Sequence, residues 1–396
     1  MVGQQEKRVK VLFLASWYPN NERPLSGIFI KRHAQAISKF CDVTVLYIHP
    51  GKESRENKIE EVFEDGVETI RIYLKRPVIG SKYLRTLLTS WSFLVQGFKG
   101  VKLAKRKLGR LDIIHAHVVF PMGLFGGILS RFTGIPVVIT EHTSPFSVHA
   151  RTAVHKALLQ FVLFSAKVIM PVSSSLQKQM ERYYSTDKYR VIPNVIDTGF
   201  FYPYSNKYED HSQKRLIHIS LLDNEQKNIS GLLCAVSALS QKRDDFELHI
   251  VGDGKDYGML VDLAKNLDIL DKYVFFYGRM TDSDLADMLR ESDIFVLNSN
   301  HETFAVVCAE ALASGIPVLA TRCGGPEDYI TPQVGMLIEP GNTEELVRAI
   351  DKMLMSHKSY DPKSLHDYVE QKFGVERIGM EIYNIYNTVL EGRTNT

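Results

Sequence analysis

Short apolar runs of strand type alternate with longer segments of helical periodicity along most of this chain. In the first half the strand-like runs are residues 9–15, 43–47, 112–115, 137–140 and 168–170, with helical segments at 28–40, 122–132 and beyond 151. A second series has strand-like runs at 216–220, 246–251, 274–277, 294–297 and 317–321, each followed by a helical segment. Such alternation predicts βαβ units and parallel sheets, which is the α/β fold class.

The alternation stops between Pro193 and Lys214, where proline, glycine and asparagine precede a polar tail. A chain of 396 residues is longer than one hydrophobic core usually supports. We therefore predict two doubly wound, Rossmann-like domains at residues 1–195 and 215–374, joined by a linker at 196–214. A C-terminal helix within 375–396 is expected to pack back on the first domain. Ligands of such sheets bind outside the carboxyl ends of the strands, so we expect a site in a central cleft between two facing domains.

Composition and charge narrow the function classes without choosing one. Lys and Arg number 48 against 46 acidic residues, and this net charge of +2 gives no reason to expect a nucleic-acid partner. The four cysteines, Cys41, Cys234, Cys308 and Cys323, lack CxxC spacing, which argues against a disulfide framework and a zinc site. No run of eighteen apolar residues occurs, so no membrane span is predicted. We expect a cytoplasmic protein, with a peripheral position on the inner face of the membrane as an alternative.

The most informative stretch is NSNHETFAVVCAEALASGIPVLATRCGG, residues 298–325. The apolar run before it predicts a strand, and residues 305–314 predict a helix that Gly315 ends. Glu302 therefore lies in the strand-to-helix turn, and Glu310 lies about two turns further along. At a rise of roughly 1.5 Å per residue, the two carboxylates are on the order of 12 Å apart, too far for one acid/base pair.

The start of this helix is suited to an anion. Backbone N–H groups of Thr303, Phe304 and Ala305 are expected to be free there, with a partial positive charge that favours a phosphate. Two distant carboxylates around such a position can bracket an elongated ligand. A nucleotide sugar fits, with its diphosphate at the helix start, its ribose toward Glu310 and its hexose toward Glu302.

A lysine in the second domain adds to this site. Lys227 follows the first predicted strand of that domain, where the loops of a doubly wound sheet meet their ligand, and its ammonium could neutralise a leaving diphosphate. A solvated surface lysine explains the same position equally well. Gly252-Asp253-Gly254 follows a predicted strand, but a tight turn explains it as well as a dinucleotide site does. The chain has no GxxxxGK[ST], GxSxG or HExxH motif.

With these residues in place, the second domain resembles that of the retaining glycosyltransferases of family four, which have the two-domain GT-B fold. The segments ETFAVVCAE, ALASGIPVLAT, GGPEDYI and GMLIEPGN match the family in order, and HIVGDG and VFFYGRM extend the likeness upstream. In the first domain PLSGIFIKRHAQAI, DIIHAH and VIPNVIDTGFF match more loosely. The matches cover most of the chain.

The resemblance implies roles for individual residues. It assigns Lys227 to the donor diphosphate, Glu302 to the transferred sugar and Glu310 to the ribose. The further residues that it implies are the amides of Thr303, Phe304 and Ala305 for phosphate and sugar, Arg279 and Met280 for the base, Gly27 for backbone approach to the phosphates, and His142 near the reacting sugar. A loop histidine bonded to backbone is the other interpretation of His142, and for His115 and His117 we favour structural or acceptor-side roles over metal binding.

One departure from the family concerns the phosphate. The family places an arginine about five residues before the lysine, and here that position holds Leu222. Half of the expected Arg–Lys clamp is missing, so Arg279 or another cation must replace it, or the donor is held differently.

Residues 83–110 predict one long helix with two possible roles. It is apolar at Leu84, Leu87, Leu88, Trp91, Leu94, Val95 and Phe98 and basic toward its C-terminal end. One hypothesis packs it into the core. The other rests it on an anionic membrane surface, where a lipid-linked acceptor would be available.

The resulting hypothesis is a retaining hexosyltransferase that needs no metal or other cofactor. It would move a hexose from a nucleoside diphosphate sugar to a hydroxyl of a sugar or lipid-linked acceptor, in bacterial polysaccharide, lipopolysaccharide or glycolipid assembly. Two alternatives keep the fold, since a fold does not determine a function. One is a nucleotide-sugar epimerase, and the other is a non-catalytic nucleotide-sugar binding protein. The residues do not determine the sugar, the base or the acceptor.

Overall fold

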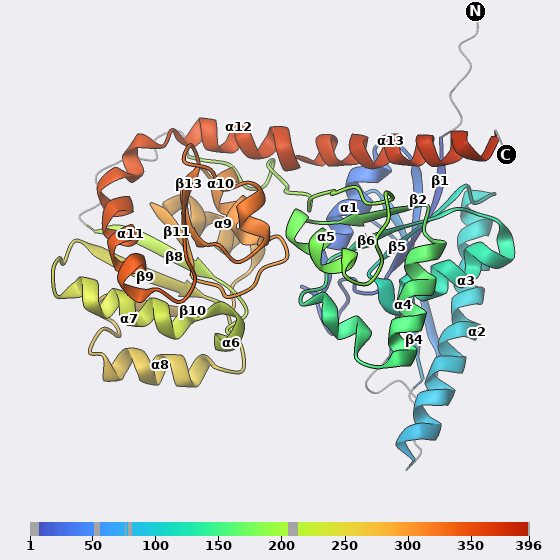
Figure 1. Ribbon diagram of the computed structural model, residues 1–396, viewed down its shortest axis with the longest axis horizontal. Coiled ribbons are helices and arrows are strands. Elements are labelled where there is room, and N and C mark those ends of the chain that lie inside the picture. Colours follow the sequence, from blue (N-terminus) through green and yellow to red (C-terminus); the bar gives the residue numbers. More distant parts are fainter. Residues whose placement is uncertain (1–7, 51–55, 76, 78–80, 205–212, 395–396) are drawn as a thin grey trace, which may run out of the picture. The chain divides into compact units, whose positions relative to one another are not determined.

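The computed structural model describes residues 8–50, 56–75, 77, 81–204 and 213–394 (Figure 1). The chain divides into two compact units. Unit 1 comprises Met1–Val172, Leu176–Val195 and Val375–Thr396, and unit 2 comprises Ser173–Ser175 and Ile196–Gly374. Each unit is built on one sheet.

The sheet of unit 1 has seven strands in the order β3-β4-β2-β1-β5-β6-β7. Their bounds are β1 Lys10–Ala15, β2 Asp42–Pro50, β3 Lys58–Glu64, β4 Val67–Leu74, β5 Ile113–His117, β6 Val137–Glu141 and β7 Val168–Pro171. All neighbours pair in parallel except β3, which pairs antiparallel to β4 across the turn at Asp65 and Gly66. The sequence patterns had not indicated this hairpin, so the expected purely parallel sheet carries an antiparallel edge strand.

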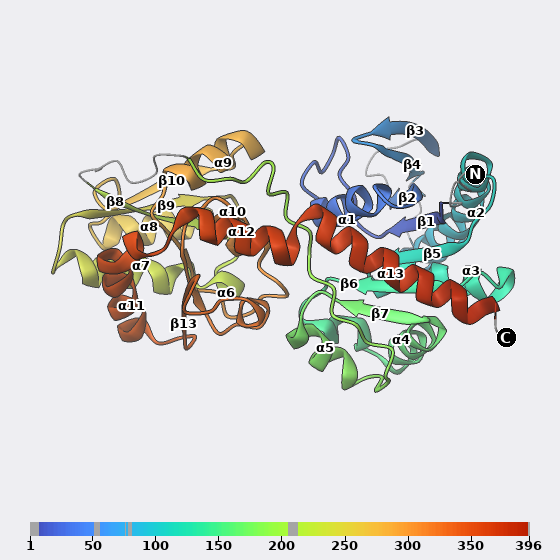
Figure 2. The same cartoon turned by 90° about the horizontal axis from the view of Figure 1, so that it is seen from above.

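Helices cover both faces of this sheet (Figures 1 and 2). They are α1 Ile28–Ser38, α2 Lys82–Leu108, α3 Leu124–Thr133, α4 Ala153–Ser165, α5 Ser174–Glu181 and α13 Val375–Thr394. On one face Phe13 packs with Ile30 of α1 and Ile382 of α13. On the other face Leu14 lies against α3, because a side chain at Gly126 would approach within 3.4 Å of it. Burial on both sides explains the continuous apolar run of β1.

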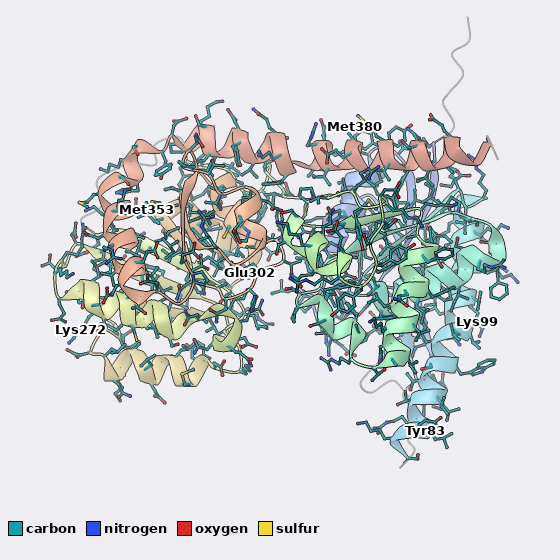
Figure 3. The ribbon with its side chains drawn as sticks, in the orientation of Figure 1. Tyr83, Lys99, Lys272, Glu302, Met353 and Met380 are labelled. Carbon is teal, nitrogen blue, oxygen red and sulfur yellow. The ribbon has the colours of Figure 1, made fainter. Side chains whose placement is uncertain are left out.

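The first half of α2 has little contact with the sheet. Its buried residues are Gln96, Gly97, Gly100 and Ala104. A Cβ at Gly100 would lie 2.5 Å from a methyl of Leu46, so the helix approaches the sheet closely at this glycine. Tyr83, Leu87 and Trp91 are 75%, 49% and 68% exposed, and this part extends beyond the neighbouring elements of unit 1 (Figures 1 and 3). The prediction that the apolar stripe packs in the core is therefore wrong for this half, because small residues form the contact face.

The sheet of unit 2 has six strands, all parallel, in the order β10-β9-β8-β11-β12-β13. Their bounds are β8 Lys214–Ile219, β9 Phe246–Val251, β10 Val274–Gly278, β11 Ile294–Leu297, β12 Val318–Thr321 and β13 Gly335–Ile338. The helices are α6 Asn224–Lys227, α7 Ile229–Ser240, α8 Tyr257–Asn266, α9 Asp282–Glu291, α10 Val306–Ala313, α11 Thr343–Ser356 and α12 Pro362–Phe373.

Part of the predicted linker packs on unit 2. The N–H of Ile196 donates to the carbonyl of Phe373 at 2.9 Å, the hydroxyl of Thr198 bonds the carboxylate of Glu370, and Phe201 is buried. Residues 205–212 of that prediction lie outside the described part of the chain.

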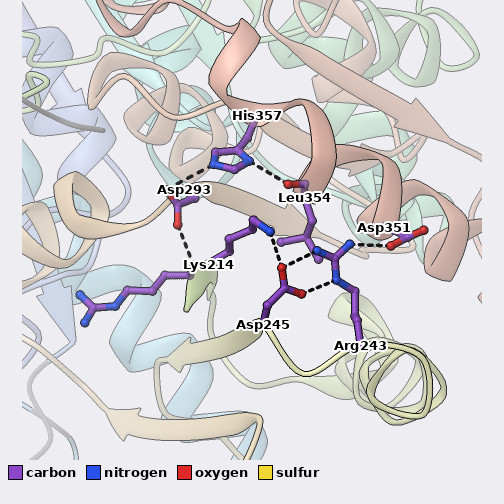
Figure 4. Close-up of polar contacts among 8 residues, drawn as sticks. Lys214, Arg243, Asp245, Asp293, Asp351, Leu354 and His357 are labelled. Atoms are coloured by element: carbon purple, nitrogen blue, oxygen red, sulfur yellow. Dashed lines mark hydrogen bonds and ion pairs between the residues drawn. The ribbon is translucent and has the colours of Figure 1, made fainter. Parts of the chain in front are cut away.

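A polar network holds the amino ends of the strands of unit 2 (Figure 4). Asp245, just before β9, bonds Lys214 and the guanidinium of Arg243, which also reaches Asp351 at 2.6 Å. These two cations hold the pKa of Asp245 well below its ordinary value. Because the network lies at the amino edge of the sheet, we infer that it stabilises the fold of unit 2. Ligands of doubly wound sheets bind at the opposite, carboxyl edge.

Candidate active site

The two central strands of unit 2 position the residues that the sequence singled out. From β8 the chain continues through β9 and β10 on one side, whereas β11, β12 and β13 lie on the other. β8 and β11 are therefore the neighbours at which the winding direction reverses. A crevice outside the carboxyl ends at such a switch point is where doubly wound sheets bind ligands. Lys227 follows β8 and Glu302 follows β11.

Lys227 and Glu302 form a close ion pair. The Nζ of Lys227 lies 2.5 Å from Oε1 of Glu302, and the hydroxyl of Ser299 donates to the same oxygen at 2.7 Å. The lysine and glutamate side chains are only 14% and 9% exposed. Both predicted residues thus belong to one site. Figure 3 labels Glu302 in unit 2. Ser299 was not predicted, because a serine after a strand does not by itself indicate a functional site.

The loops that carry this pair are tied together by their backbones and amide side chains. The N–H of Asn300 donates to the carbonyl of Gln226 at 2.8 Å, and the side-chain amide of Gln226 donates to the carbonyl of His301 at 3.1 Å. The amide of Asn298 donates to the carbonyl of Asn228 at 2.9 Å. Such cross-links pre-organise two charged groups that are far apart in the sequence.

Two glycines after β12 let a third loop reach the site. A Cβ on Gly324 would lie 2.6 Å from the carbonyl oxygen of Glu302, and one on Gly325 would lie 2.4 Å from Cα of Phe304. The N–H of Gly325 instead donates to the Glu302 carbonyl at 3.0 Å. Only glycine permits this approach, which explains the Gly-Gly of the matched motif.

The helix start next to Glu302 has strained backbone. α10 begins at Val306, one residue later than predicted, and Ala305 precedes it with φ 61° and ψ 68°. The hydroxyl of Tyr329 holds this turn by donating to the carbonyls of Phe304 and Ala305, at 3.0 and 2.9 Å. Within the described chain the amides of Thr303, Phe304 and Ala305 donate no hydrogen bond. Strain held in place beside free donors is typical of ligand sites.

The remaining donor-side candidates lie at the same edge of the sheet. Glu310 is within α10 and buried, at 6% exposed. Arg279, exposed, and Met280, half-buried, directly follow β10. All six strands of this sheet are parallel, so their carboxyl ends bring these residues to one side.

The position of the missing arginine needs a correction. Leu222 is fully buried in the core of unit 2, so an arginine there would point away from any ligand. Its neighbour Leu221 is 64% exposed and lies in the loop after β8. Alternate residues of an extended segment point to opposite sides, so Leu221 points outward where Leu222 points into the core. Position 221 is therefore the one at which a cation could bind a phosphate.

Gly252 and Gly254 have a packing role in this loop cluster. A Cβ on Gly252 would lie 1.9 Å from the carbonyl oxygen of Ser220, and one on Gly254 would lie 2.5 Å from that of Leu222. The interpretation as a tight turn explains this geometry.

In unit 1, Gly27 and His142 lie at the ends of different elements. Gly27 precedes α1 with φ 69°, and a Cβ there would lie 2.4 Å from the carbonyl oxygen of Trp17. His142 directly follows β6 and is 8% exposed, and its Nε2 lies 3.0 Å from Nδ1 of His117. Burial, and then neighbouring imidazoles, hold the pKa values of both histidines well below the ordinary value, so both are neutral at neutral pH.

Hydrogen bonds distinguish the histidines of this cluster. His115 is paired on both sides, with the hydroxyl of Tyr386 at 2.6 Å and that of Thr140 at 2.7 Å, which is a structural arrangement. By contrast, Nε2 of His117 and Nδ1 of His142 are buried without a hydrogen-bond partner in the described chain. The pair therefore keeps hydrogen-bonding capacity for a ligand.

The loop that carries His142 is held by a buried carboxylate. Glu141 is fully buried and accepts hydrogen bonds from the backbone N–H groups of Val119, His142 and Thr143, at 2.8, 2.8 and 2.7 Å. It thus connects the loops after β5 and β6, and sequence reasoning did not find it.

A buried histidine below the Lys227 loop makes stability depend on pH. The Nδ1–H of His218 on β8 donates to the carbonyl of Val296 at 2.9 Å, and its Nε2 accepts from the hydroxyl of Ser220 at 2.8 Å. Burial lowers the pKa of His218 to about 4. The unfolded chain takes up a proton below pH 6.5, so stability is complete above that pH and is lost as pH falls toward 4.

We expect His218→Asn, which keeps a donor for Val296, to reduce this loss. Between pH 6.5 and 4 the pH dependence of its free energy of unfolding should correspond to about one proton fewer than in the wild type. Urea unfolding at several pH values measures this difference. Equal slopes in the two proteins would show that His218 does not carry the effect.

Metal and disulfide chemistry gain no support from the described side chains. Over those residues, no group of three or more His, Cys, Asp or Glu is placed to hold a metal ion. All four cysteines are free. Within the same part of the chain, no helix is both long and apolar enough to cross a bilayer.

Comparisons with known proteins agree with this architecture. The profile of the family described as glycosyl transferases group 1 matches residues 205–371, and that of glycosyltransferase family 4 matches residues 26–200. An alpha-monoglucosyldiacylglycerol synthase of Streptococcus pneumoniae is 31% identical over 74% of this chain and 70% of its own. The chain belongs to the family 4 glycosyltransferases. An N-acetyl-alpha-D-glucosaminyl L-malate synthase of Bacillus anthracis is 28% identical over 75% of this chain and 79% of its own.

A solved structure extends the likeness to the fold of this glycosyltransferase. The Anabaena protein HepE in complex with UDP superposes with a TM-score of 0.71 over 96% of this chain and all of that one, at 19% identity. The GT-B class predicted from the sequence, with two α/β units on doubly wound sheets, is confirmed.

Proposed function

We propose that this glycosyltransferase is a retaining, metal-independent hexosyltransferase whose donor is a nucleoside diphosphate sugar. The observation that carries the proposal is the Lys227–Glu302 pair at the switch point of unit 2, beside free amides at the start of α10. This site offers a cation and N–H donors to a diphosphate and a carboxylate to a sugar. The UDP bound by HepE supports a nucleotide as the anchor of the donor.

In this proposal the protein supplies charge and position rather than a covalent nucleophile. The bond between the sugar C1 and the diphosphate oxygen breaks while the acceptor oxygen bonds C1 on the same face. The departing phosphate oxygen takes the acceptor proton. Lys227 stabilises the negative charge on the leaving group, and Glu302 orients the sugar and balances positive charge that develops on it.

For the other predicted residues we propose the roles that the family resemblance implies. Glu310 binds the ribose, Arg279 and Met280 hold the base, and Gly27 lets backbone approach the phosphates. His142 is neutral, so it contributes hydrogen bonds near the reacting sugar rather than acting as an acid. With His117 as partner, its ring orientation is defined before the ligand binds.

A product assay tests this function directly. Each of the UDP-, GDP- and ADP-hexoses is incubated with the protein and a panel of sugar and lipid acceptors, with and without EDTA. We expect one donor to give an α-linked product from an α-linked donor, as read by NMR, at an unchanged rate in EDTA. A β-linked product would exclude retention, and loss of activity in EDTA would exclude metal independence.

For the acceptor we propose a sugar or lipid-linked hydroxyl in bacterial glycoconjugate assembly. The S. pneumoniae relative is named for a glucosylated diacylglycerol, and the B. anthracis relative for a malate glycoside. A lipid-linked acceptor places the enzyme on the cytoplasmic face of the membrane.

The exposed side chains of α2, in both halves of the helix, form the surface that we propose for membrane contact. Three lysines on its C-terminal half, Lys99, Lys102 and Lys105, are exposed. Lys107 instead pairs with Glu61 at 3.3 Å and Glu68 at 2.8 Å. The surface thus combines apolar side chains with three lysines that have no ion-pair partner among the described residues, as helices at an anionic membrane do.

Charge reversal of those three lysines to glutamate should weaken binding to anionic liposomes. Each cation contributes about 1 kcal/mol near an anionic surface, so we expect at least a tenfold loss in a sedimentation assay. Reversal of Lys272, a lysine of unit 2 paired with Asp268, is the matched control and should change nothing. Equal sedimentation of both variants would exclude α2 as the contact.

A further inference from the structure

A pocket in unit 1 lies at the switch point of its sheet, beside the turn at Gly27, since Trp17 and Ser26 both line it. It has a volume of about 530 Å³, which is the size of small-molecule sites. Ser16 and Trp17 follow β1, and Pro121 follows β5, the neighbouring strand on which the winding direction reverses. The Ser16 hydroxyl accepts from the N–H of Met122 at 3.3 Å, which joins the two loops.

The lining of this pocket is apolar over most of its surface and includes a few polar groups. Ser16, Arg23, Ser26, Tyr47 and His49 supply the polar groups. The apolar part is built by Trp17, Ile48, Leu74, Phe93, Leu94, Pro121, Leu124, Phe125 and Ile128. A ligand that matches both parts is an amphiphile with a compact polar group and a hydrocarbon chain.

The charge among these polar groups favours an anion. The guanidinium of Arg23 is exposed and pairs with no carboxylate in the described chain, whereas His49 is engaged by Glu22 at 3.2 Å and by the hydroxyl of Tyr47 at 3.0 Å. The uncommitted cation is therefore Arg23, and guanidinium groups are well suited to bind phosphate.

Helix α2 supplies part of the wall of the pocket. Thr89, Ser90, Phe93 and Leu94 line the pocket, and Trp91, 68% exposed, lies on the same two turns. Gly97 packs against Phe125 of α3 and Gly100 packs against Leu46 of the sheet, whereas most side chains in the first half of α2 are exposed. These side chains are therefore available to a chain that enters from a bilayer.

We propose that this pocket binds the hydrocarbon chain of an anionic lipid, with the lipid phosphate at Arg23. Resting on the proposed function, the lipid is the glycosyl acceptor, and the pocket places its polar end at the carboxyl ends of β1 and β5. This assigns the acceptor class as a lipid that has an alkyl or isoprenoid chain, a phosphate and, beyond the phosphate, the hydroxyl that receives the sugar. Donor recognition by unit 2 does not depend on it.

The chain contains an internal probe for this pocket. Only two tryptophans occur, Trp17 in the pocket lining and Trp91 on the exposed face of α2. In the Trp91→Phe variant, Trp17 alone reports on the pocket. We expect 12-bromododecyl phosphate, added below its micelle concentration, to quench Trp17 fluorescence with saturation.

Substitutions at two threonines of α2 distinguish binding in the pocket from binding elsewhere on the helix. Thr89 lines the pocket and Thr86 does not, although each hydroxyl bonds the carbonyl four residues earlier, at 2.8 and 2.9 Å. In the Trp91→Phe background, Thr89→Phe places a phenyl ring in the pocket and should weaken the binding of the bromododecyl phosphate at least tenfold. Thr86→Phe should leave the affinity unchanged.

Arg23→Gln tests the phosphate contact. It should weaken the binding of 12-bromododecyl phosphate about tenfold, which is the size expected of a charged hydrogen bond, and leave the binding of 12-bromododecyl maltoside unchanged.

Absence of saturable quenching, or equal quenching in the Thr89→Phe and Thr86→Phe variants, would overturn the proposal. Quenching of Trp91 alone by brominated liposomes would show membrane contact only and would also overturn it. If the enzyme transferred a sugar to a water-soluble acceptor while the pocket bound no lipid, the proposed function would be supported and only the lipid pocket would be excluded.

Discussion

Glu302→Gln should reduce kcat by about 10²-fold or more, since removal of one pre-organised charged group at a developing charge costs this much. The substitution keeps the shape of the side chain and its hydrogen bond to Ser299. Lys227→Met should lower kcat by a similar factor, because the leaving diphosphate then lacks its cation. Steady-state kinetics with the donor identified by the product assay measures both.

The direct contact of these two residues adds a sharper expectation. They lie 2.5 Å apart, so the double variant should lose less than the product of the two single losses. Glu339→Gln, at an exposed glutamate of the same unit that pairs with Arg322 at 3.2 Å, is the control and should retain full kcat. Near-normal kcat in either single variant would remove that residue from the mechanism.

Gly252→Ala should destabilise unit 2 by ~3 kcal/mol or more, because it combines forbidden backbone geometry with a clash in a packed region. Gly252 has φ 138°, and a Cβ there would lie 1.9 Å from the carbonyl oxygen of Ser220. This carbonyl belongs to backbone just beyond β8, so it cannot rotate away as a side chain would. Urea unfolding followed by circular dichroism measures the change.

Gly341→Ala separates the two causes of this effect. Gly341 also has a positive φ, 78°, but a Cβ there would meet nothing within 4 Å. Its substitution should therefore cost only about 1–2 kcal/mol, the penalty of left-handed backbone. If Gly252→Ala were no more costly than Gly341→Ala, the close approach of the loop after β9 to β8 would be wrong.

The strand β11 and the helix α10 show how well local patterns predict this fold. Residues 294–297 form the strand with the predicted bounds, and the helix begins one residue later than predicted. Apolar runs buried on both faces of a parallel sheet are hard to mistake when helices alternate with them. The β3–β4 hairpin was missed, although Asp65–Gly66 between two alternating runs is a strong hairpin signal.

The α2 helix shows where periodicity fails. An apolar stripe predicts a helix correctly but cannot state what covers that stripe. In the structure glycine and alanine make the contact with the sheet, and Leu87 and Trp91 are exposed. Glycine and alanine add little to a hydrophobic pattern, so the pattern does not show that they form the packing face of the helix.

The amino-acid sequence by itself determined the α/β class, the two series of strands and the charged residues Lys227 and Glu302, because these depend on local periodicity and residue chemistry. Tertiary structure alone decided that β8 and β11 are neighbours, which brings this pair within 2.5 Å across 75 residues of chain. It also decided that Leu222 is buried and Leu221 exposed, and that a pocket exists beside α2. Side-chain direction and close approach arise from contacts between segments far apart in sequence, and no local pattern records them.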